Sequence, residues 1–365
     1  MKQTGAHRKI GVFFLLTVLL LAAGCGSSGS SSAVPNQDQA TAPAAPAGDV
    51  SDAVQQIYEA AKKEGKVIYW TTDDKELEKI IEGFSKKFPG IKVESFEIQP
   101  QQAVDRIITE ASAGQTNVDV YDLYYLDAPK LIERDLIRSF EWNEVFGISP
   151  DYIDYDNKAL KTWHISLPIV YNTNLVKGDE VPKAWEDLLD PKWKGKILLE
   201  ARGLAFPTLS YVWGEEKTLE FVAQLLKQEP MIVKGGTPST QAIVNGQAAI
   251  GVGPYAFKAE QMKKQGAPID WAKVGPIALT THITGTLKNA PHPNAALLFA
   301  YYLASEEGLQ DRMAGGGGER LDAAMGPIGR TMKEHGIELL TEQWEKEEVR
   351  QRVAEKVSEM LSSTN

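Results

Sequence analysis

Cysteine and histidine are scarce in this chain of 365 residues, which contains one cysteine and five histidines. With Cys25 as its only cysteine, the chain cannot form an internal disulfide, so a disulfide-stabilised scaffold is excluded. The histidines do not have the spacing of metal ligands, and we predict no metal site. The apolar run at residues 11–23 is too short for a transmembrane helix, which needs about 20 residues.

Signatures of catalysis are also missing from the sequence. It contains no G-x-S-x-G nucleophile elbow, no G-x-x-x-x-G-K phosphate loop and no G-x-G-x-x-G dinucleotide fingerprint. The four glycines at 315–318 lack a following Lys-Ser/Thr pair and indicate a flexible loop. A formal net charge of −10 argues against nucleic acid as a partner. We therefore predict that the protein is not an enzyme and uses no cofactor.

The N-terminus has the features of a secretion signal. Basic side chains at Lys2, Arg8 and Lys9 precede the short apolar run, which has the length of a signal-peptide core. Residues 21–25 (LAAGC) resemble a bacterial lipobox, and this resemblance implies cleavage after residue 24 and a diacylglycerol on the sulfur of Cys25. The alternative is an uncleaved membrane anchor. Either way, we predict an extracytoplasmic protein held at the cell membrane, periplasmic or cell-surface, with residues 1–24 as its signal peptide.

The rest of the chain divides by composition into a tether and a folded part. Residues 25–50 hold the lipidated cysteine and a Ser-, Gly-, Pro- and Ala-rich stretch that cannot bury a core. Residues 51–365 are long enough for two domains. In this part, apolar strand patterns such as 67–70 and 196–199 alternate with helical patterns. This alternation predicts an α/β fold in which helices cover both faces of parallel sheets.

Several stretches, in order along the chain, resemble the family 1 extracellular solute-binding proteins, which have the type II periplasmic-binding fold. The most specific stretch, residues 182–197 (PKAWEDLLDPKWKGKI), closely matches the family segment P-x-S-W-x-D-L-x-D-P-x-W-K-G-K. The other stretches that carry the resemblance are 67–72 with 91–93, 168–176, 245–251, 285–296 and 305–310. The nearest subgroup is the ferric-iron branch, which also contains receptors for thiamine, polyamines, phosphonates and sugar phosphates.

The resemblance implies two doubly wound lobes joined by a hinge, with a ligand cleft between them. Lobe 1 would comprise residues 51–167 and about 280–325, and lobe 2 residues 168–279, with C-terminal helices at 326–365 docking on the body. It also implies the receptor lipoprotein of an ABC importer, which captures a small solute as a monomer and delivers it to the permease subunits in the membrane. A receptor that serves a sensory protein would have the same sequence.

Polar side chains follow two strand patterns of lobe 1, where a cleft loop is expected. Thr72 and Asp73 come after the strand at 67–70, and Tyr125 and Asp127 come after the strand at 118–123. Their hydroxyl and carboxylate groups are candidate ligand contacts. The alternative for Thr72 and Asp73 is that they cap the helix that follows.

Two features of lobe 2 predict an anion site. Thr237 as the cap, with Pro238 at the first helical position and Ser239 next, predicts a helix start whose free N–H groups suit a carboxylate or phosphate. Arg202, just after the strand at 196–199, is placed to add a bidentate contact. The alternatives are an ordinary capped turn without ligand, and an Arg202 that pairs with Glu200 at the surface.

Three further candidates lie at the crossovers and after the strand at 248–252. Tyr171 lies in the first segment expected to connect the lobes, and a packed hinge tyrosine is an equal alternative to a ligand contact. His282 precedes the second such segment, and a lone histidine is more often a structural residue than a ligand contact. Iron-binding relatives have adjacent tyrosines after the strand at 248–252, whereas here Tyr255 precedes Ala256 and Phe257. One tyrosine is a poor ferric site, so we predict an organic anion as the ligand. Ferric iron and a cationic solute such as a polyamine or thiamine are the alternatives.

Overall fold

The structure is a computed structural model that describes residues 52–71 and 77–363. The predicted signal peptide, the tether and Cys25 lie outside these residues. The first elements follow the apolar spacing of the sequence, as Leu77, Ile80 and Phe84 form the buried face of a helix. These elements are α1 (Asp52–Glu64), β1 (Lys66–Thr71), α2 (Leu77–Lys87), β2 (Lys92–Glu97), α3 (Pro100–Ser112) and β3 (Val120–Tyr124).

The first sheet has seven strands and mixes parallel with antiparallel pairs. Its parallel part is β2, β1 and β3, and β11 (Ile277–Thr286) lies antiparallel against β3. The antiparallel strands β5 (Ala159–Ser166) and β4 (Ile153–Asp154) continue the sheet beyond β11. The short strand β12 (Leu339–Leu340) pairs with the start of β11. The sheet is thus parallel on the side built by β1, β2 and β3 and at the short pairing of β12 with β11, and antiparallel elsewhere.

The second sheet has five strands in the order β10-β6-β9-β7-β8. Strands β7 (Ile197–Glu200), β8 (Met231–Val233) and β9 (Ile250–Val252) are parallel, while β6 (Ile169–Asn172) and β10 (Ile269–Trp271) are antiparallel additions. The prediction of parallel sheets is therefore right for one part of each sheet. The other part is antiparallel because the chain passes between the sheets on β5–β6 and returns on β11.

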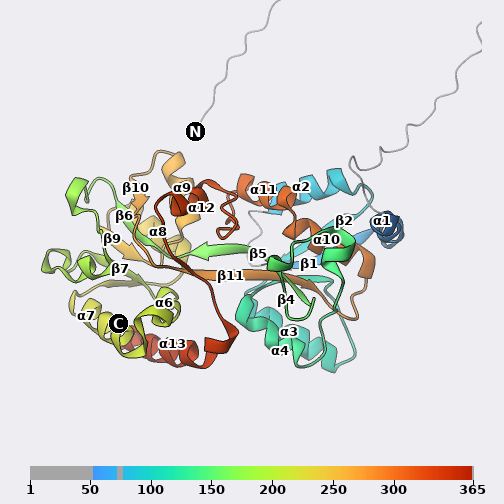
Figure 1. The fold of residues 1–365 in the computed structure, drawn as a ribbon, viewed down its shortest axis with the longest axis horizontal. Coiled ribbons are helices and arrows are strands. Elements are labelled where there is room, and N and C mark those ends of the chain that lie inside the picture. Colours follow the sequence, from blue (N-terminus) through green and yellow to red (C-terminus); the bar gives the residue numbers. More distant parts are fainter. Residues whose placement is uncertain (1–51, 72–76, 364–365) are drawn as a thin grey trace, which may run out of the picture. The chain divides into compact units, whose positions relative to one another are not determined.

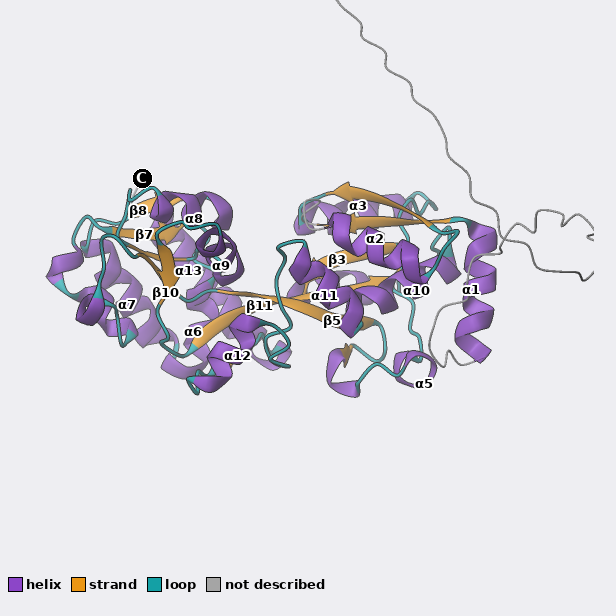
Figure 2. Ribbon diagram, turned by 90° about the horizontal axis from the view of Figure 1, so that it is seen from above, coloured by secondary structure: helices purple, strands orange, loops and turns teal. Residues whose placement is uncertain are grey.

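Helices cover both sheets (Figure 1). Around the first sheet lie α4 (Ala128–Ile132), α5 (Trp142–Phe146), α10 (Pro293–Ala304) and α11 (Glu306–Ala314), together with α1, α2 and α3. Around the second sheet lie α6 (Ala205–Trp213), α7 (Glu215–Lys227), α8 (Gly236–Val244), α9 (Ala256–Lys264), α12 (Pro327–Glu334) and α13 (Glu347–Ser362). Figure 2 shows the helices and the strands that they surround from above. Among the described residues, no helix is both long and apolar enough to span a bilayer.

Two hydrophobic clusters form the cores, and each core with its sheet is a lobe. Leu160 of β5 and Ile283 of β11 belong to the lobe 1 cluster, whereas Ile165 and Leu279 of the same strands belong to the lobe 2 cluster. Strands β5 and β11 therefore connect the two cores, and we call this strand pair the hinge. Its side-by-side course is visible in Figure 1. The observed architecture confirms the predicted α/β fold with two sheets.

The C-terminal helix belongs to the lobe 2 core. Val353, Val357 and Leu361 lie on one face of α13 and are buried in the lobe 2 cluster. Burial of each such side chain contributes about 1.5–3 kcal/mol. The remaining residues of the helix are mostly charged and face solvent, which explains the mixed composition of this segment.

Candidate functional site

The carboxyl ends of the parallel strands are the expected position of a ligand in an open α/β sheet. In lobe 2 these ends are Glu200 of β7, Val233 of β8 and Val252 of β9, and in lobe 1 they include Thr71 of β1 and Tyr124 of β3. The candidate site is built from residues at these ends and on the hinge.

Arg202 lies directly after β7 and is held by its neighbour Glu200. The Arg202 Nε donates to Glu200 Oε1 at 2.9 Å, and the backbone N of Arg202 donates to Oε2 at 3.1 Å. The same Oε1 accepts from the backbone N of Gly235 at 2.9 Å. The pairing with Glu200 was one of the two predicted roles of Arg202, but Glu200 is buried and only 1% of its side chain is exposed. The Arg202 side chain is 38% exposed and can be reached by a solute.

Two tyrosine side chains lie at the Arg202 guanidinium. Arg202 Nη2 donates to the hydroxyl of Tyr255 at 2.8 Å, and Tyr124 of lobe 1 is close enough to interact with the charge of Arg202. Burial raises the pKa of Tyr124 to about 12, and Arg202 opposes this rise. Although burial lowers the pKa of Arg202, Tyr255 and Glu200 hold it above its ordinary value. We call Glu200, Arg202, Gly235, Tyr255 and Tyr124 the Arg202 cluster.

His282 of the hinge lies next to this cluster. Its ring makes an edge contact with Tyr124 at 5.0 Å and stacks on Trp163 of β5 at 3.7 Å between ring centroids. His282 Nδ1 lies 2.8 Å from Asp122 Oδ1, and both side chains are almost fully buried. Trp163 also contacts Phe257 of lobe 2, which stacks against Tyr255. The predicted residues Arg202, Tyr255 and His282 are therefore brought together through Tyr124 and these aromatic rings.

Two predicted residues of lobe 1 lie elsewhere. Tyr125 begins the short 3-10 turn Tyr125–Asp127, and its hydroxyl donates to Asp154 at 3.1 Å. Asp127 forms an ion pair with Lys130 at 2.7 Å. Both side chains are engaged within lobe 1. Thr72 and Asp73 lie outside the described residues.

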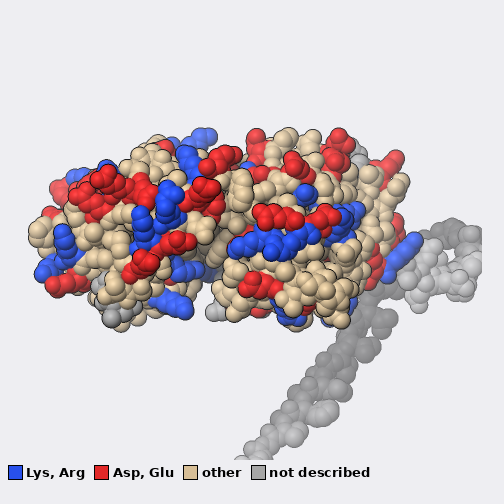
Figure 3. Space-filling view, turned by 90° about the horizontal axis from the view of Figure 1, so that it is seen from below, with Lys and Arg blue, Asp and Glu red and all other residues tan. Residues whose placement is uncertain are grey.

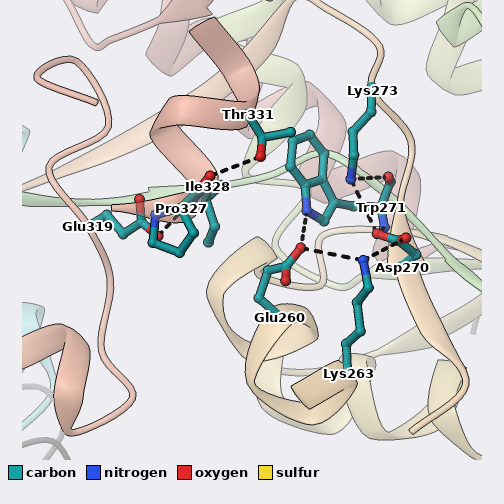
Figure 4. A network of polar contacts seen from close by, with 9 residues as sticks. All are labelled: Glu260, Lys263, Asp270, Trp271, Lys273, Glu319, Pro327, Ile328 and Thr331. Atoms are coloured by element: carbon teal, nitrogen blue, oxygen red, sulfur yellow. Dashed lines mark hydrogen bonds and ion pairs between the residues drawn. The ribbon is translucent and has the colours of Figure 1, made fainter. Parts of the chain in front are cut away.

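Tyr171 is also placed away from Arg202. On β6 it pairs with Asp270 of β10, and burial together with that carboxylate raises the pKa of Tyr171. Figure 4 shows the polar network around Asp270, which accepts from Lys263 at 2.8 Å and from Lys273 at 3.2 Å. Tyr171 thus stands beside a local charge network on the antiparallel side of the second sheet.

The helix after β8 begins earlier than the sequence predicted. Helix α8 starts at Gly236 with Gly235 as its N-cap, so Thr237 is not the cap and Pro238 is not the first helical residue. Gly235 has φ +97°, which only glycine adopts readily, and this turn starts the helix two residues early. Thr237 is exposed, whereas Ser239 is buried, and its Oγ has no partner among the described residues.

The comparisons with known proteins agree with this architecture. A family model described as "Bacterial extracellular solute-binding protein" matches residues 79–319 of the 365. The chain belongs to this family. This solute-binding protein is 33% identical over 143 residues to an uncharacterized protein of Haemophilus influenzae, covering 36% of this chain and 40% of that one. It is 24% identical to iron uptake protein A1 of Synechocystis over 60% of this chain and 65% of the relative. The chain thus spans 40% and 65% of the lengths of these curated relatives.

A solved structure shows the same fold. The periplasmic binding protein AfuA from Actinobacillus pleuropneumoniae, with exogenous fructose-6-phosphate bound, superposes with a TM-score of 0.63. The match covers 82% of this chain and 99% of AfuA at 19% identity. At this identity the likeness shows the fold alone, which is the type II periplasmic-binding fold that the sequence predicted.

Three residues of the site in this solute-binding protein were missed by the sequence analysis. Tyr125 was chosen and Tyr124 was not, although alternation along β3 puts Tyr124 on the same face as Asp122. Glu200 ends an apolar strand, and that position was the available signal for its burial. Trp163 lies in β5, a strand that was not predicted, and no local sequence pattern indicated that Trp163 belongs to the site.

Proposed function

We propose that this solute-binding protein is the extracytoplasmic receptor of an ABC importer and captures a small organic anion. The observation that carries the proposal is Arg202, whose exposed guanidinium lies at the carboxyl end of β7, bonds to Tyr255 of lobe 2 and lies close to Tyr124 of lobe 1. A ligand bound there contacts both lobes. Movement about the hinge would then bury it and create the closed form that the permease recognises.

The charge of the whole protein does not decide its ligand. Acidic and basic side chains are interspersed on the face shown in Figure 3, in keeping with the many exposed ion pairs. The local charge at the strand ends is what a solute meets. There, Arg202 offers a planar guanidinium for a carboxylate, with the Tyr124 and Tyr255 hydroxyls beside it.

The proposed receptor is held at the membrane by a lipid and does not catalyse a reaction. Cleavage before Cys25 and lipidation of its thiol would keep the receptor at the membrane close to the permease, with residues 26–50 as the tether. The family is one of binding proteins, and we propose binding and release without chemical change of the solute.

Ferric iron is the second candidate. Tyr124 and Tyr255 bring two phenol groups to Arg202, which the sequence analysis did not foresee when it counted one tyrosine. One curated relative is an iron uptake protein. Among the described residues, no group of three or more His, Cys, Asp or Glu side chains could hold a metal ion, so tyrosines would have to dominate such a site.

A thermal-shift screen tests the proposal. The purified protein is heated with organic carboxylates, phosphate esters, phosphonates, thiamine, polyamines and ferric citrate. A ligand at 100 times its dissociation constant stabilises the fold by about 2.7 kcal/mol, which the melting curve resolves easily. Stabilisation by an organic anion that is lost in Arg202→Gln supports the proposal. Stabilisation by ferric citrate alone, with a visible phenolate-to-iron absorption band, would replace it with the iron receptor.

A further inference from the structure

The carboxylate of Glu200 occupies a position where proteins commonly bind anions. It is buried at the end of β7 and accepts hydrogen bonds from Arg202 Nε, from the backbone N of Arg202 and from the backbone N of Gly235. Gly235 is the N-cap of the nine-residue helix α8. A guanidinium together with N–H groups at a helix start is the donor set that recognises phosphate and sulfate. In this protein the Glu200 carboxylate accepts the hydrogen bonds of these donors, in the place that a bound anion would occupy.

The start of α8 at Gly236 is also closed to a ligand, because the ring of Tyr255 covers it. The ring of Tyr255 lies against Gly236 so closely that a Cβ at Gly236 would meet ring carbons at 2.3–2.5 Å. Gly236 is accordingly buried. An anion arriving from solvent therefore meets the exposed part of Arg202 and not the helix start at Gly236.

The charges at this point are balanced within the protein. The positive charge of Arg202 has Glu200 as its partner at 2.9 Å. An incoming group with one negative charge still gains from the exposed side of the guanidinium. A group with two negative charges doubles both its attraction to Arg202 and its repulsion from the buried Glu200, so the balanced pair offers it little net gain. The cost of removing that group from water rises about fourfold, because it grows with the square of the charge, and a dianion is therefore disfavoured relative to a monoanion.

We propose that Glu200 is a specificity-determining residue that restricts the site to ligands with a single negative charge, such as carboxylates, and excludes inorganic phosphate and sulfate. This inference rests on the proposed function of Arg202 as the anion contact. The receptor would then bind monoanions and not the phosphate and sulfate dianions present in its surroundings.

Equilibrium dialysis of the full chain with radiolabelled inorganic phosphate at pH 7.5, where most phosphate is a dianion, tests the proposal. We expect no saturable binding to the wild type and a gain of at least about tenfold in affinity for Glu200→Gln, since the variant removes the repulsion and frees the donors. The double variant Glu200→Gln/Arg202→Gln should lose that gain. The matched control Glu186→Gln, at an exposed pair with Lys217, should behave as the wild type.

Two outcomes would overturn the proposal. One is wild-type phosphate binding as tight as that of the variant, and the other is a Glu200→Gln protein with a native circular dichroism spectrum and no gain. If Glu200→Gln does not fold, the wild type is compared with Arg202→Gln. Wild-type phosphate binding at about pH 5.5, where phosphate is a monoanion, that is lost at pH 7.5 and in Arg202→Gln supports Glu200 as the counter-charge. Wild-type binding at pH 7.5 that Arg202→Gln abolishes contradicts it. The organic ligand is measured separately, so failure of the proposed function is recognised by its own readout.

Discussion

Two acid–base pairs, each with a buried carboxylate, lie close to the candidate site, and they differ in how many hydrogen bonds their atoms make. Glu200 and Arg202 belong to lobe 2, and both carboxylate oxygens of Glu200 accept hydrogen bonds. Asp122 and His282 lie on β3 and the hinge strand β11 and share one contact of 2.8 Å. Asp122 Oδ2 and His282 Nε2 have no partner among the described residues. The lobe 2 pair fixes local structure through several donors, whereas the hinge pair depends on one contact.

This difference predicts unequal effects of mutation. A buried carboxylate with three donors leaves all of them unpaired when it is removed, and the cost is correspondingly large. Removing one residue of a pair that shares a single contact leaves only one group without its partner, so the loss in the free energy of unfolding is smaller. The hinge pair is also enclosed by the rings of Trp163 and Tyr124, so packing maintains its position in addition to the hydrogen bond.

The largest effect is expected for Glu200→Ala. We expect a loss of about 4 kcal/mol in the free energy of unfolding, because the Arg202 charge and the Gly235 N–H lose their acceptor. Urea denaturation followed by circular dichroism measures it. Glu186→Ala removes an exposed carboxylate and should change stability by less than about 1 kcal/mol. Similar losses in both variants would contradict the assignment of Glu200 as a structural centre.

The second largest loss of stability is expected when His164, on the hinge strand β5, takes up a proton. Burial lowers the pKa of His164 to about 4, and its Nδ1 accepts from the backbone N of Leu321 at 3.2 Å. Unfolded histidine takes up its proton near pH 6.5 and the folded residue near pH 4, so the wild type should lose about 3 kcal/mol of stability between these values. Urea titrations at pH 7 and pH 4 measure the loss. His164→Asn, which keeps an acceptor, should show a smaller pH dependence, and an identical pH profile would contradict the prediction.

A smaller effect is expected at the hinge pair. Asp122→Asn keeps the shape of the side chain and an acceptor oxygen but removes the charge that faces His282 Nδ1. We expect a loss of about 2 kcal/mol, the contribution of a hydrogen bond to a charged group. A double-mutant cycle with His282→Gln isolates the coupling between the two residues. A loss as large as that of Glu200→Ala would remove the distinction between the pairs.

The smallest effect lies at Glu342, which accepts from the backbone N of the hinge residue Thr281 at 2.7 Å. Burial raises the pKa of Glu342 to about 7, so its contribution to stability is present at low pH and is lost as the pH rises from about 4.5 to 7. Glu342→Gln should flatten this part of the pH profile by about 1 kcal/mol, since solvent screens a half-buried carboxylate. An unchanged slope in thermal unfolding between pH 5 and pH 8 would contradict this role.

The sequence predicted the elements with regular apolar spacing and missed those without it. Helix α6 has the predicted bounds 205–213, and β8 was found at its three apolar residues 231–233. Strand β11 was missed because threonines and His282 interrupt its apolar residues. Its β-branched residues were the available signal, since such side chains favour strands. Because β11 and β5 form the hinge, the expected crossings between the lobes came from the family resemblance and not from a strand pattern.

The candidate site was predicted less fully than the fold, for reasons of burial and backbone geometry. Arg202 and Tyr255 were chosen from their positions after strands and His282 from its place near an expected crossover, and the structure gathers them around Tyr124. The burial of Glu200 depends on contacts with Gly235, 35 residues away, which local patterns do not contain. The start of α8 depends on a positive φ at Gly235. Cap and proline preferences alone placed that start two residues too late.

Calorimetric titration of the strongest organic anion from the screen tests the central claim most directly. The ligand is titrated into the wild type and into Arg202→Gln under identical conditions. If Arg202 is the anion contact, the variant should bind at least tenfold more weakly, which corresponds to about 1.4 kcal/mol or more. Equal affinity in the two proteins would contradict the account and move the ligand away from the carboxyl end of β7.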